Sequence, residues 1–287
     1  MAGRTNIGDV RLRSYSSAFS RRGFQDILRF GDFGHLDWLY HSERFTAETI
    51  TYLDYLQKLY RSLAKGYRCE YVFKNEIIHH LIQQYGSRRS VIFNEFRIGS
   101  SVADLAFFNG ESRAFEIKTE FDSDKRLHKQ LQDYCRLFDK CYLVIPEEEY
   151  DHYATVVEGG IGIILLSFRN GRVSLETKRK AELNHSLDVD LLMSCCRTRE
   201  YESFIRHRFG SLPDVPVREQ YSACCELLRS LPSEELKRFF LTSVKRRRSD
   251  LRELRPLPKC LRQMALSLNL GEKESAILIE KLNCVIC

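Results

Sequence analysis

The chain has 287 residues, of which 43% are hydrophobic and 29% are charged, and its formal net charge is +6. This length can hold one large domain, or a main domain with a helical appendage, and the composition excludes a fibrous or wholly disordered protein. No apolar run approaches the roughly 18 residues that span a bilayer, and the N-terminus MAGRTNIGDVRLRS lacks the apolar core of a signal peptide. We therefore expect a cytoplasmic protein with no membrane partner, in which the ten scattered cysteines stay reduced.

Helical spacing dominates the first part of the chain. Apolar residues repeat at helical spacing between Thr46 and Leu63, and Gly66 ends the pattern. A second helix is predicted from about Arg68 to Tyr85. We assign residues 1–65 to an N-terminal helical segment.

The period then changes from 3.6 to 2, which predicts strands at 91–98, 101–108 and 113–119. The Asn109-Gly110 pair predicts a hairpin between the last two strands. A helix follows from about Asp124 to Phe138, and the apolar runs 141–146 and 160–167 predict two further buried strands. Residues 66–175 therefore form a mixed α/β core.

The C-terminal region, residues 176–287, reads as helices separated by prolines, and positive charge concentrates there. Between Arg197 and Arg262 we count 16 Lys and Arg against 9 Asp and Glu. A basic patch of this kind can bind nucleic-acid phosphates, although a solvated helix face is the more frequent explanation of a single run. We predict substrate contacts by the run Lys245, Arg246, Arg247 and Arg248. A module that binds a protein partner is compatible with the same helices.

The stretch RAFEIKT, residues 113–119, places Glu116 and Lys118 on one face of a strand. A solvated strand face is the simplest explanation of such charges. Asp104, on the preceding strand, shares the face of Glu116 only if paired residue numbers sum to an even value. A two-residue turn gives an odd sum, whereas a three-residue loop, with Gly110 in a left-handed bulge position, gives an even one. We predict the three-residue loop.

Two converging carboxylates beside a lysine suit Mg²⁺ or Mn²⁺, which take oxygen ligands and keep several waters. Such a metal polarises a phosphoryl oxygen and acidifies a bound water. Lys118 would orient that water and stabilise the charge that develops on the phosphate. This set of groups is sufficient for hydrolysis of a phosphodiester.

Asp104 and the stretch Glu116-Ile117-Lys118, with eleven residues between Asp104 and Glu116, resemble the D…ExK core of the PD-(D/E)XK nuclease superfamily. Ala103 stands where the family name has proline. The resemblance implies a restriction-endonuclease-like mixed sheet flanked by helices in αβββαβ order, which agrees with the predicted elements. Gln130 and Tyr134 are similar to the QxxxY element of one branch.

The family also implies an acidic residue on the upstream helix. The span EYVFKNE offers Glu70 and Glu76, of which we favour Glu70 because it shares the inward stripe of that helix. Residues 67–145 also resemble uncharacterised bacterial members of the superfamily that carry EYxxKN, EIKT and QxxxY elements.

The resemblance implies a Mg²⁺-dependent deoxyribonuclease, with a role in bacterial defence or DNA repair. Glu70, Asp104 and Glu116 would hold the metal, and Lys118 would activate water. Gln130 would support catalysis, and Tyr134 would contact the substrate, while the basic helices would track the nucleic-acid backbone. The alternative is a non-cleaving module that binds nucleic acid or a protein on a nuclease fold.

Overall fold

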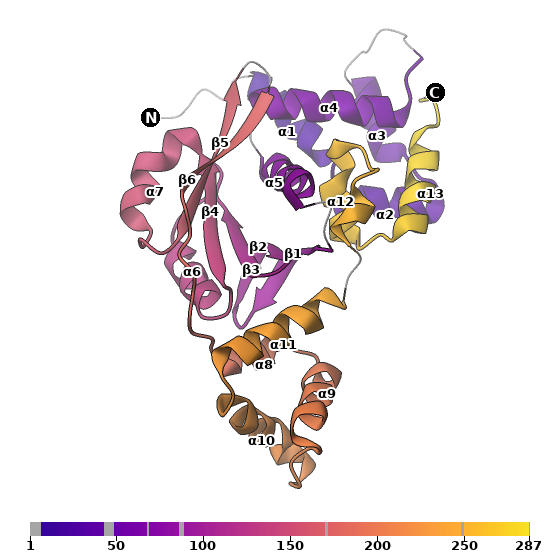
Figure 1. Ribbon diagram of the computed structural model, residues 1–287. Helices are drawn as coiled ribbons and strands as arrows, with labels where there is room; N and C mark the ends of the chain where they lie inside the picture. Colours follow the sequence, from indigo (N-terminus) through magenta and orange to yellow (C-terminus); the bar gives the residue numbers. More distant parts are fainter. Residues whose placement is uncertain are drawn as a thin grey trace.

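The computed structural model describes residues 7–42, 49–67, 69–85, 89–169, 172–247 and 250–286. The described residues form an α/β structure in which a six-stranded mixed sheet is flanked by helices (Figure 1). The N-terminal helices are α1 (Ile7–Ser17), α2 (Arg21–Phe30), α3 (Gly34–Ser42), α4 (Tyr52–Gly66) and α5 (Glu70–Tyr85).

Helices α4 and α5 agree with the predicted helical pattern, with shifted starts. The Thr51 side chain accepts a hydrogen bond from the backbone N–H of Asp54, which fixes the first turn of α4 one residue later, at Tyr52. The predicted starts at Thr46 and Arg68 lie outside the described residues. Helix α5 is buried over most of its length, and its buried Lys74 side chain contacts Asp104 on the sheet.

The six strands lie in the sheet in chain order, from β1 to β6. The pairs β1–β2, β2–β3 and β5–β6 are antiparallel, whereas β3–β4 and β4–β5 are parallel. The strands are β1 (Val91–Ile98), β2 (Ser101–Phe108), β3 (Ser112–Ile117), β4 (Lys140–Pro146), β5 (Gly162–Arg169) and β6 (Arg172–Arg179).

The β2–β3 hairpin has the predicted register. Phe108 pairs with Ser112 and Leu105 with Phe115, so paired residue numbers sum to an even value and three residues form the loop. The Asn109 side chain accepts hydrogen bonds from the backbone N–H groups of Gly110 and Glu111, at 2.7 and 3.3 Å. The prediction that Gly110 adopts a left-handed conformation is wrong, because Gly110 does not have a positive φ. The hydrogen bonds to the Asn109 side chain order this loop instead.

Helices cover both faces of the sheet. Helix α5 contributes Phe73 and Ile77 to one apolar cluster with β2 and β3. On the opposite face pack α6 (Leu127–Cys135), α7 (Tyr150–Val156), α8 (Val189–Cys195), α9 (Thr198–Phe209), α10 (Val217–Arg229) and α11 (Ser233–Lys245). The chain order α5, β1, β2, β3, α6, β4 is the order of elements that the sequence predicts.

The C-terminal region divides between two places in the structure. Helices α8 and α11 contact the sheet, and α9 and α10 extend the same apolar cluster away from it (Figure 1). Helices α12 (Arg262–Leu268) and α13 (Glu272–Leu282) share an apolar cluster with α2 and α4. The short 3-10 turns are η1 (Glu147–Glu149), η2 (Leu251–Leu254) and η3 (Lys259–Leu261). The three-segment division of the chain stays a prediction. Within the described ranges, no helix is long and apolar enough to span a membrane.

Candidate functional site

The hairpin register places Asp104 opposite Glu116, since the adjacent residues Leu105 and Phe115 are paired. Asp104 Oδ2 accepts the backbone N–H of Ile117 at 2.8 Å, which ties its carboxylate to β3. Glu116 is 2% exposed and Lys118 is 8% exposed. The charges on this strand therefore lie inside the protein, and the solvated-face explanation is wrong.

Lys74 on α5 links this helix to strand β2. Its ammonium lies 2.5 Å from Glu70 Oε1 and 3.4 Å from Asp104 Oδ1, and its side chain is only 3% exposed. Glu70 and Lys74 are four residues apart, so they share one face of the helix. The structure thus brings Glu70 and Asp104 together through a lysine to which sequence reasoning gave no role.

Glu116 has its own set of partners. Lys118 Nζ lies 3.0 Å from Glu116 Oε1, and the Tyr134 hydroxyl lies 2.7 Å from Glu116 Oε2. The same hydroxyl lies 2.7 Å from the carbonyl oxygen of Val102, so its single hydrogen serves one acceptor at a time. Gln130 lowers the pKa of Glu116, and the Oε1 atom of Gln130 is buried without a hydrogen-bond partner among the described residues. Helix α6 therefore carries both of the residues that the sequence pairs as a QxxxY element.

We define the buried charged cluster as Lys74, Asp104, Glu116 and Lys118, together with Glu70 at its edge, whose side chain is 55% exposed. Burial shifts the pKa values of three of its members. Burial raises the pKa of Asp104 to about 7, with repulsion from Glu116 and Glu70 adding to it and Lys74 opposing it. Burial also raises the pKa of Glu116, while Lys118 and Tyr134 lower it in part. Burial lowers the pKa of Lys74, but the Asp104 and Glu70 carboxylates outweigh this and raise it overall.

The ammonium groups of Lys74 and Lys118 pair with the carboxylates of this cluster. Each of the three carboxylates predicted to hold a metal, Glu70, Asp104 and Glu116, contacts a lysine. Within the described ranges, no three His, Cys, Asp or Glu side chains are grouped so that they could hold a metal ion. The binding of Mg²⁺ or Mn²⁺ by these carboxylates stays a prediction.

Glu76, the alternative upstream acid, lies apart from this cluster. It is 3% exposed, accepts the Tyr60 hydroxyl at 2.9 Å, and lies 2.6 Å from Lys259 Nζ. The favoured choice, Glu70, is the one that contacts Lys74 beside Asp104.

Sequence reasoning also missed Glu95 on β1. Its neighbours Asn94 and Phe96 pair with Leu105 and Ala103, so Glu95 lies opposite Asp104. Glu95 has a φ of 55°, a left-handed conformation that is uncommon outside glycine and costs free energy. Only the structure reveals this feature, because strand periodicity carries no signal for a single strained residue.

The residues of the basic run, 245–248, have different surroundings in the structure. Lys245 Nζ donates to the carbonyl oxygen of Asn109 at 2.7 Å, and burial lowers its pKa. Arg247 donates to Glu200 Oε1 at 2.7 Å and to the Cys195 carbonyl at 2.9 Å, and its side chain is 10% exposed. Arg246 is exposed, and Arg248 lies outside the described residues. Two of the four predicted contacts thus serve the packing of the chain.

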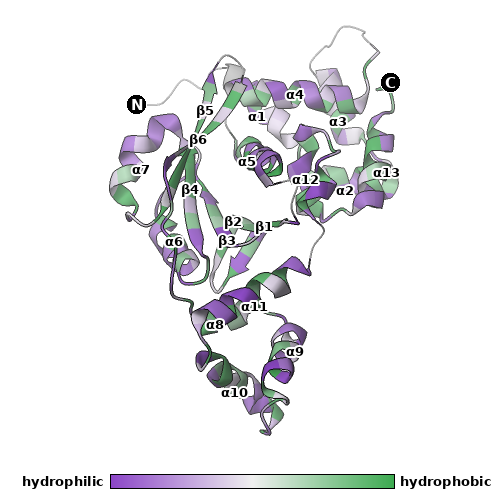
Figure 2. Ribbon diagram, viewed as in Figure 1, coloured by the Kyte–Doolittle hydropathy of each residue, from purple (hydrophilic) through white to green (hydrophobic). Residues whose placement is uncertain are grey.

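A groove between α9 and α11, with a volume of about 710 Å³, places further arginines beside Arg246. Phe204 and Phe239 stack in it, with ring centroids 4.3 Å apart, which holds the two helices together. Both helices carry hydrophilic residues along their length (purple in Figure 2). We call this feature the basic groove and define it by three exposed arginines that line it, Arg199, Arg238 and Arg246.

These three arginines differ from most other cations of the segment 197–262. Within the part of the chain that the structure describes, none of the three forms an ion pair, whereas Arg208 in the same groove pairs with Glu235 at 2.7 Å. Other cations of the segment that form ion pairs are Arg206, Arg218, Arg229, Lys237, Arg247, Arg252 and Lys259. The basic groove therefore gathers positive charge that the protein itself does not neutralise.

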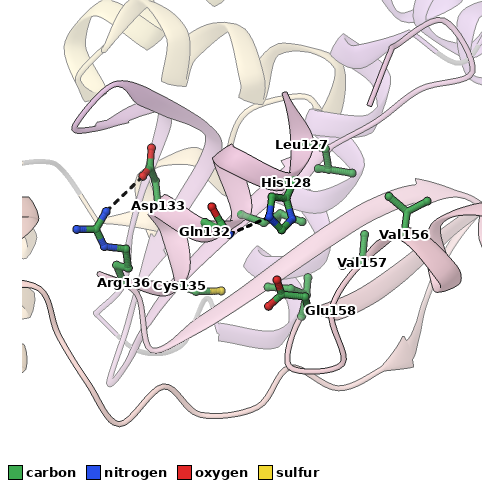
Figure 3. A pocket seen from close by; sticks show the side chains of 11 residues that line it. Leu127, His128, Gln132, Asp133, Cys135, Arg136, Val156, Val157 and Glu158 are labelled. Atoms are coloured by element: carbon green, nitrogen blue, oxygen red, sulfur yellow. Dashed lines mark hydrogen bonds and ion pairs between the residues drawn. The ribbon is translucent and has the colours of Figure 1, made fainter. Parts of the chain in front are cut away.

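A smaller pocket of about 320 Å³ lies beside α6 (Figure 3). His128, near the predicted site in sequence, lines this pocket and lies 2.8 Å from the amide nitrogen of Gln132. Arg136 lies 3.8 Å from Asp133 and 2.5 Å from Asp188. His128 and Arg136 of this pocket are thus engaged with neighbouring polar side chains. The pocket shares no residue with the buried charged cluster or the basic groove.

Comparison with known proteins gives a family match over residues 64–255, to the model described as bacteriophage P4 protein cII. Protein cII of Enterobacteria phage P4 is 28% identical over 161 residues, which cover 55% of this chain and 60% of that protein. The matched stretch is therefore less than two thirds of the relative's own length. A protein of unknown function from Silicibacter pomeroyi, SPO1766, matches 48% of this chain and 89% of its own at 15% identity and a TM-score of 0.32.

The family match corrects the sequence-based assignment. The residues it spans include Glu70, Asp104, Glu116, Lys118 and Gln130, yet the family is not a PD-(D/E)XK nuclease family. The predicted membership of that superfamily is wrong, and so is the predicted function as a metal-dependent nuclease in defence or repair. Since the model matches more than half of the chain, this protein belongs to the bacteriophage P4 protein cII family.

Proposed function

We propose that this protein binds nucleic acid through the basic groove and does not cleave it. The observation that carries the proposal is the set of three exposed arginines, Arg199, Arg238 and Arg246, which line one groove without ion-pair partners among the described residues. All three lie within the family-matched region.

Phosphate groups are the ligands that best complement this groove. Arginine presents several N–H donors in a planar fork and binds phosphate oxygens with two parallel hydrogen bonds. The three arginines come from α9, from α11 and from the residue after α11, so both helices supply positive charge to the groove. Contacts of this kind fix the position of a backbone without reading its sequence.

The core of the protein carries the buried charged cluster at the junction of α5, β2 and β3. The buried charged cluster has its carboxylates bound by Lys74 and Lys118, an arrangement that stabilises the junction of α5, β2 and β3. We also propose that the core follows a restriction-endonuclease-like arrangement, which the order α5, β1, β2, β3, α6, β4 supports. This would make the protein a non-cleaving module on such a fold.

Fluorescence anisotropy with labelled duplex and single-stranded DNA of equal length tests the proposal. The test variant carries Arg199→Gln, Arg238→Gln and Arg246→Gln. The control carries Arg22→Gln, Arg29→Gln and Lys273→Gln, which remove the same charge from exposed positions of α2 and α13.

We expect the groove variant to lose at least about tenfold in affinity at low salt, because up to three phosphate contacts disappear. The control should stay within about twofold of the wild type, since its charges lie outside the groove. Equal losses in the two variants would mean that net charge alone governs binding. Undiminished binding by the groove variant would show that the nucleic acid binds elsewhere.

A further inference from the structure

A second cavity lies between α4, α5, β6 and η3. Its volume is about 550 Å³, within the range of roughly 300–1,000 Å³ that small-molecule sites occupy. Its polar lining comes from three separate elements, α4, α5 and η3, which converge on one space. None of its residues belongs to the basic groove or to the buried charged cluster.

The polar end of the cavity is fixed by Glu76 and Tyr60. Glu76 is 3% exposed and Tyr60 is 5% exposed, and the Tyr60 hydroxyl donates to Glu76 Oε1 at 2.9 Å. Burial, with the neighbouring Glu76 carboxylate, raises the pKa of Tyr60 well above its ordinary value, so this hydroxyl stays a donor. Lys259 Nζ lies 2.6 Å from the other oxygen of Glu76. The ammonium of Lys259 is therefore held in place at the cavity.

The α4 wall of the cavity carries two more cations. Arg61 and Lys65 are four residues apart, so they lie side by side on one face of the helix, where like charges repel. Both are exposed, and neither forms an ion pair with any residue in the described ranges. With Lys259 they give the cavity three positive charges against the single carboxylate of Glu76. An anion placed between Arg61 and Lys65 would relieve their repulsion.

Apolar groups line the rest of the cavity. Ala64 on α4, Val173 on β6 and Pro258 before η3 offer surfaces against which a flat ring can pack. The combination of a cationic wall and an apolar wall is suited to a molecule that carries both a phosphate and a planar base.

We propose that this cavity binds a mononucleotide, with its phosphate between Arg61, Lys65 and Lys259 and its base against Ala64, Val173 and Pro258. This site is independent of the proposed nucleic-acid binding, because it shares no residue with the basic groove. Its three cations are also different from Arg199, Arg238 and Arg246, which define the basic groove.

Isothermal titration calorimetry of the full chain with AMP and with adenosine tests the proposal. The test variant is Arg61→Ala with Lys65→Ala, two exposed positions whose loss leaves the core intact. The control is Lys58→Ala, an exposed lysine of the same helix that does not line the cavity. The groove variant of Arg199, Arg238 and Arg246 serves as a second control.

AMP is expected to bind the wild type, the Lys58 variant and the groove variant alike, and to bind the Arg61 and Lys65 variant at least about tenfold more weakly. Adenosine should bind the wild type at least about tenfold more weakly than AMP, because it lacks the phosphate. The proposal is overturned if AMP shows no binding at about 10 mM, a concentration that detects even millimolar affinity. It is also overturned if adenosine binds as well as AMP, or if the Arg61 and Lys65 variant keeps its affinity. Loss of AMP binding in the groove variant would contradict the independence of the two sites.

Discussion

The ammonium of Lys74 lies 3.4 Å from Asp104 Oδ1, and only 3% of the lysine side chain is exposed. A buried charge is costly unless an opposite charge and hydrogen bonds compensate it. The Asp104 carboxylate is compensated in both ways, because it pairs with Lys74 and accepts a hydrogen bond from the backbone N–H of Ile117 on β3. The pair therefore joins α5 to the β2–β3 hairpin, and removing one partner leaves the other uncompensated.

Replacement of Lys74 by Met should destabilise the protein by about 2–3 kcal/mol near pH 8, less than a fully buried pair would lose, because 20% of the Asp104 side chain is exposed. Met retains most of the volume of the lysine side chain, so the loss reports on charge and not on a cavity. Urea denaturation of the variant measures the change in the free energy of unfolding. Lys125→Met, at an exposed position, is the matched control and should change it by less than about 0.5 kcal/mol.

The cost of Lys74→Met should also depend on pH. The pKa of Asp104 rises from 3.8 in the unfolded chain to about 7 in the folded protein. Folding therefore takes up a proton between these values, and the contribution of Asp104 to stability decreases as the pH rises through this window. Near pH 5 Asp104 is mostly protonated and needs Lys74 less, so the variant should lose less stability there than near pH 8. An equal loss at both pH values would contradict the assigned role of Asp104.

Tyr134→Phe should cost about 1–2 kcal/mol, because the buried Glu116 carboxyl and the Val102 carbonyl lose a shared hydrogen-bond partner. Tyr142→Phe is the matched control, since its ring stacks on Phe115 and no hydrogen bond of its hydroxyl occurs among the described residues. Thermal unfolding of the two variants under the same conditions compares them. A loss as large in Tyr142→Phe would attribute the effect to the hydroxyl in general and not to the contacts of Tyr134.

Arg246 and Arg247 are adjacent in the chain and should behave in opposite ways. Arg247→Met removes the ion pair with Glu200 and the hydrogen bond to Cys195, and should destabilise the protein by about 2–3 kcal/mol. Arg246→Met should change stability by less than about 0.5 kcal/mol, because the side chain is exposed. Denaturation and DNA binding, measured on both variants, should show that only Arg246→Met weakens binding without unfolding the protein. A destabilised Arg246 variant would be evidence against its place in an open groove.

The sequence predicts the β2–β3 hairpin and its register because the signals for both are local. Strand alternation, the Asn109-Gly110 pair and the parity argument together place Asp104 opposite Glu116, and the structure confirms that register. Strand β6, in contrast, is missed because its residues 172–179 are mostly charged or polar. It is an edge strand that pairs with β5 alone, so it needs little apolar surface.

Tertiary packing decides the features that no local pattern reveals. A lysine on a helix is usually exposed, and only the approach of Asp104 explains the burial of Lys74. Arg199 and Arg238 line the same groove because α9 and α11 pack against each other through Phe204 and Phe239. The family match overturns the nuclease assignment. Carboxylates and lysines at this spacing can also form a buried cluster of ion pairs, so a short motif does not determine the chemistry.

The salt dependence of DNA binding tests the central claim, that the basic groove holds a phosphate backbone, most directly. For B-DNA the logarithm of the affinity falls with the logarithm of the salt concentration with a slope of about −0.9 for each phosphate contacted. If Arg199, Arg238 and Arg246 each contact one phosphate, the variant that lacks all three should show a slope smaller in magnitude by about 2.7 than the wild type. The Arg22, Arg29 and Lys273 control should keep the wild-type slope. A wild-type affinity that does not depend on salt, or equal slopes in the wild type and the groove variant, would contradict the proposed function.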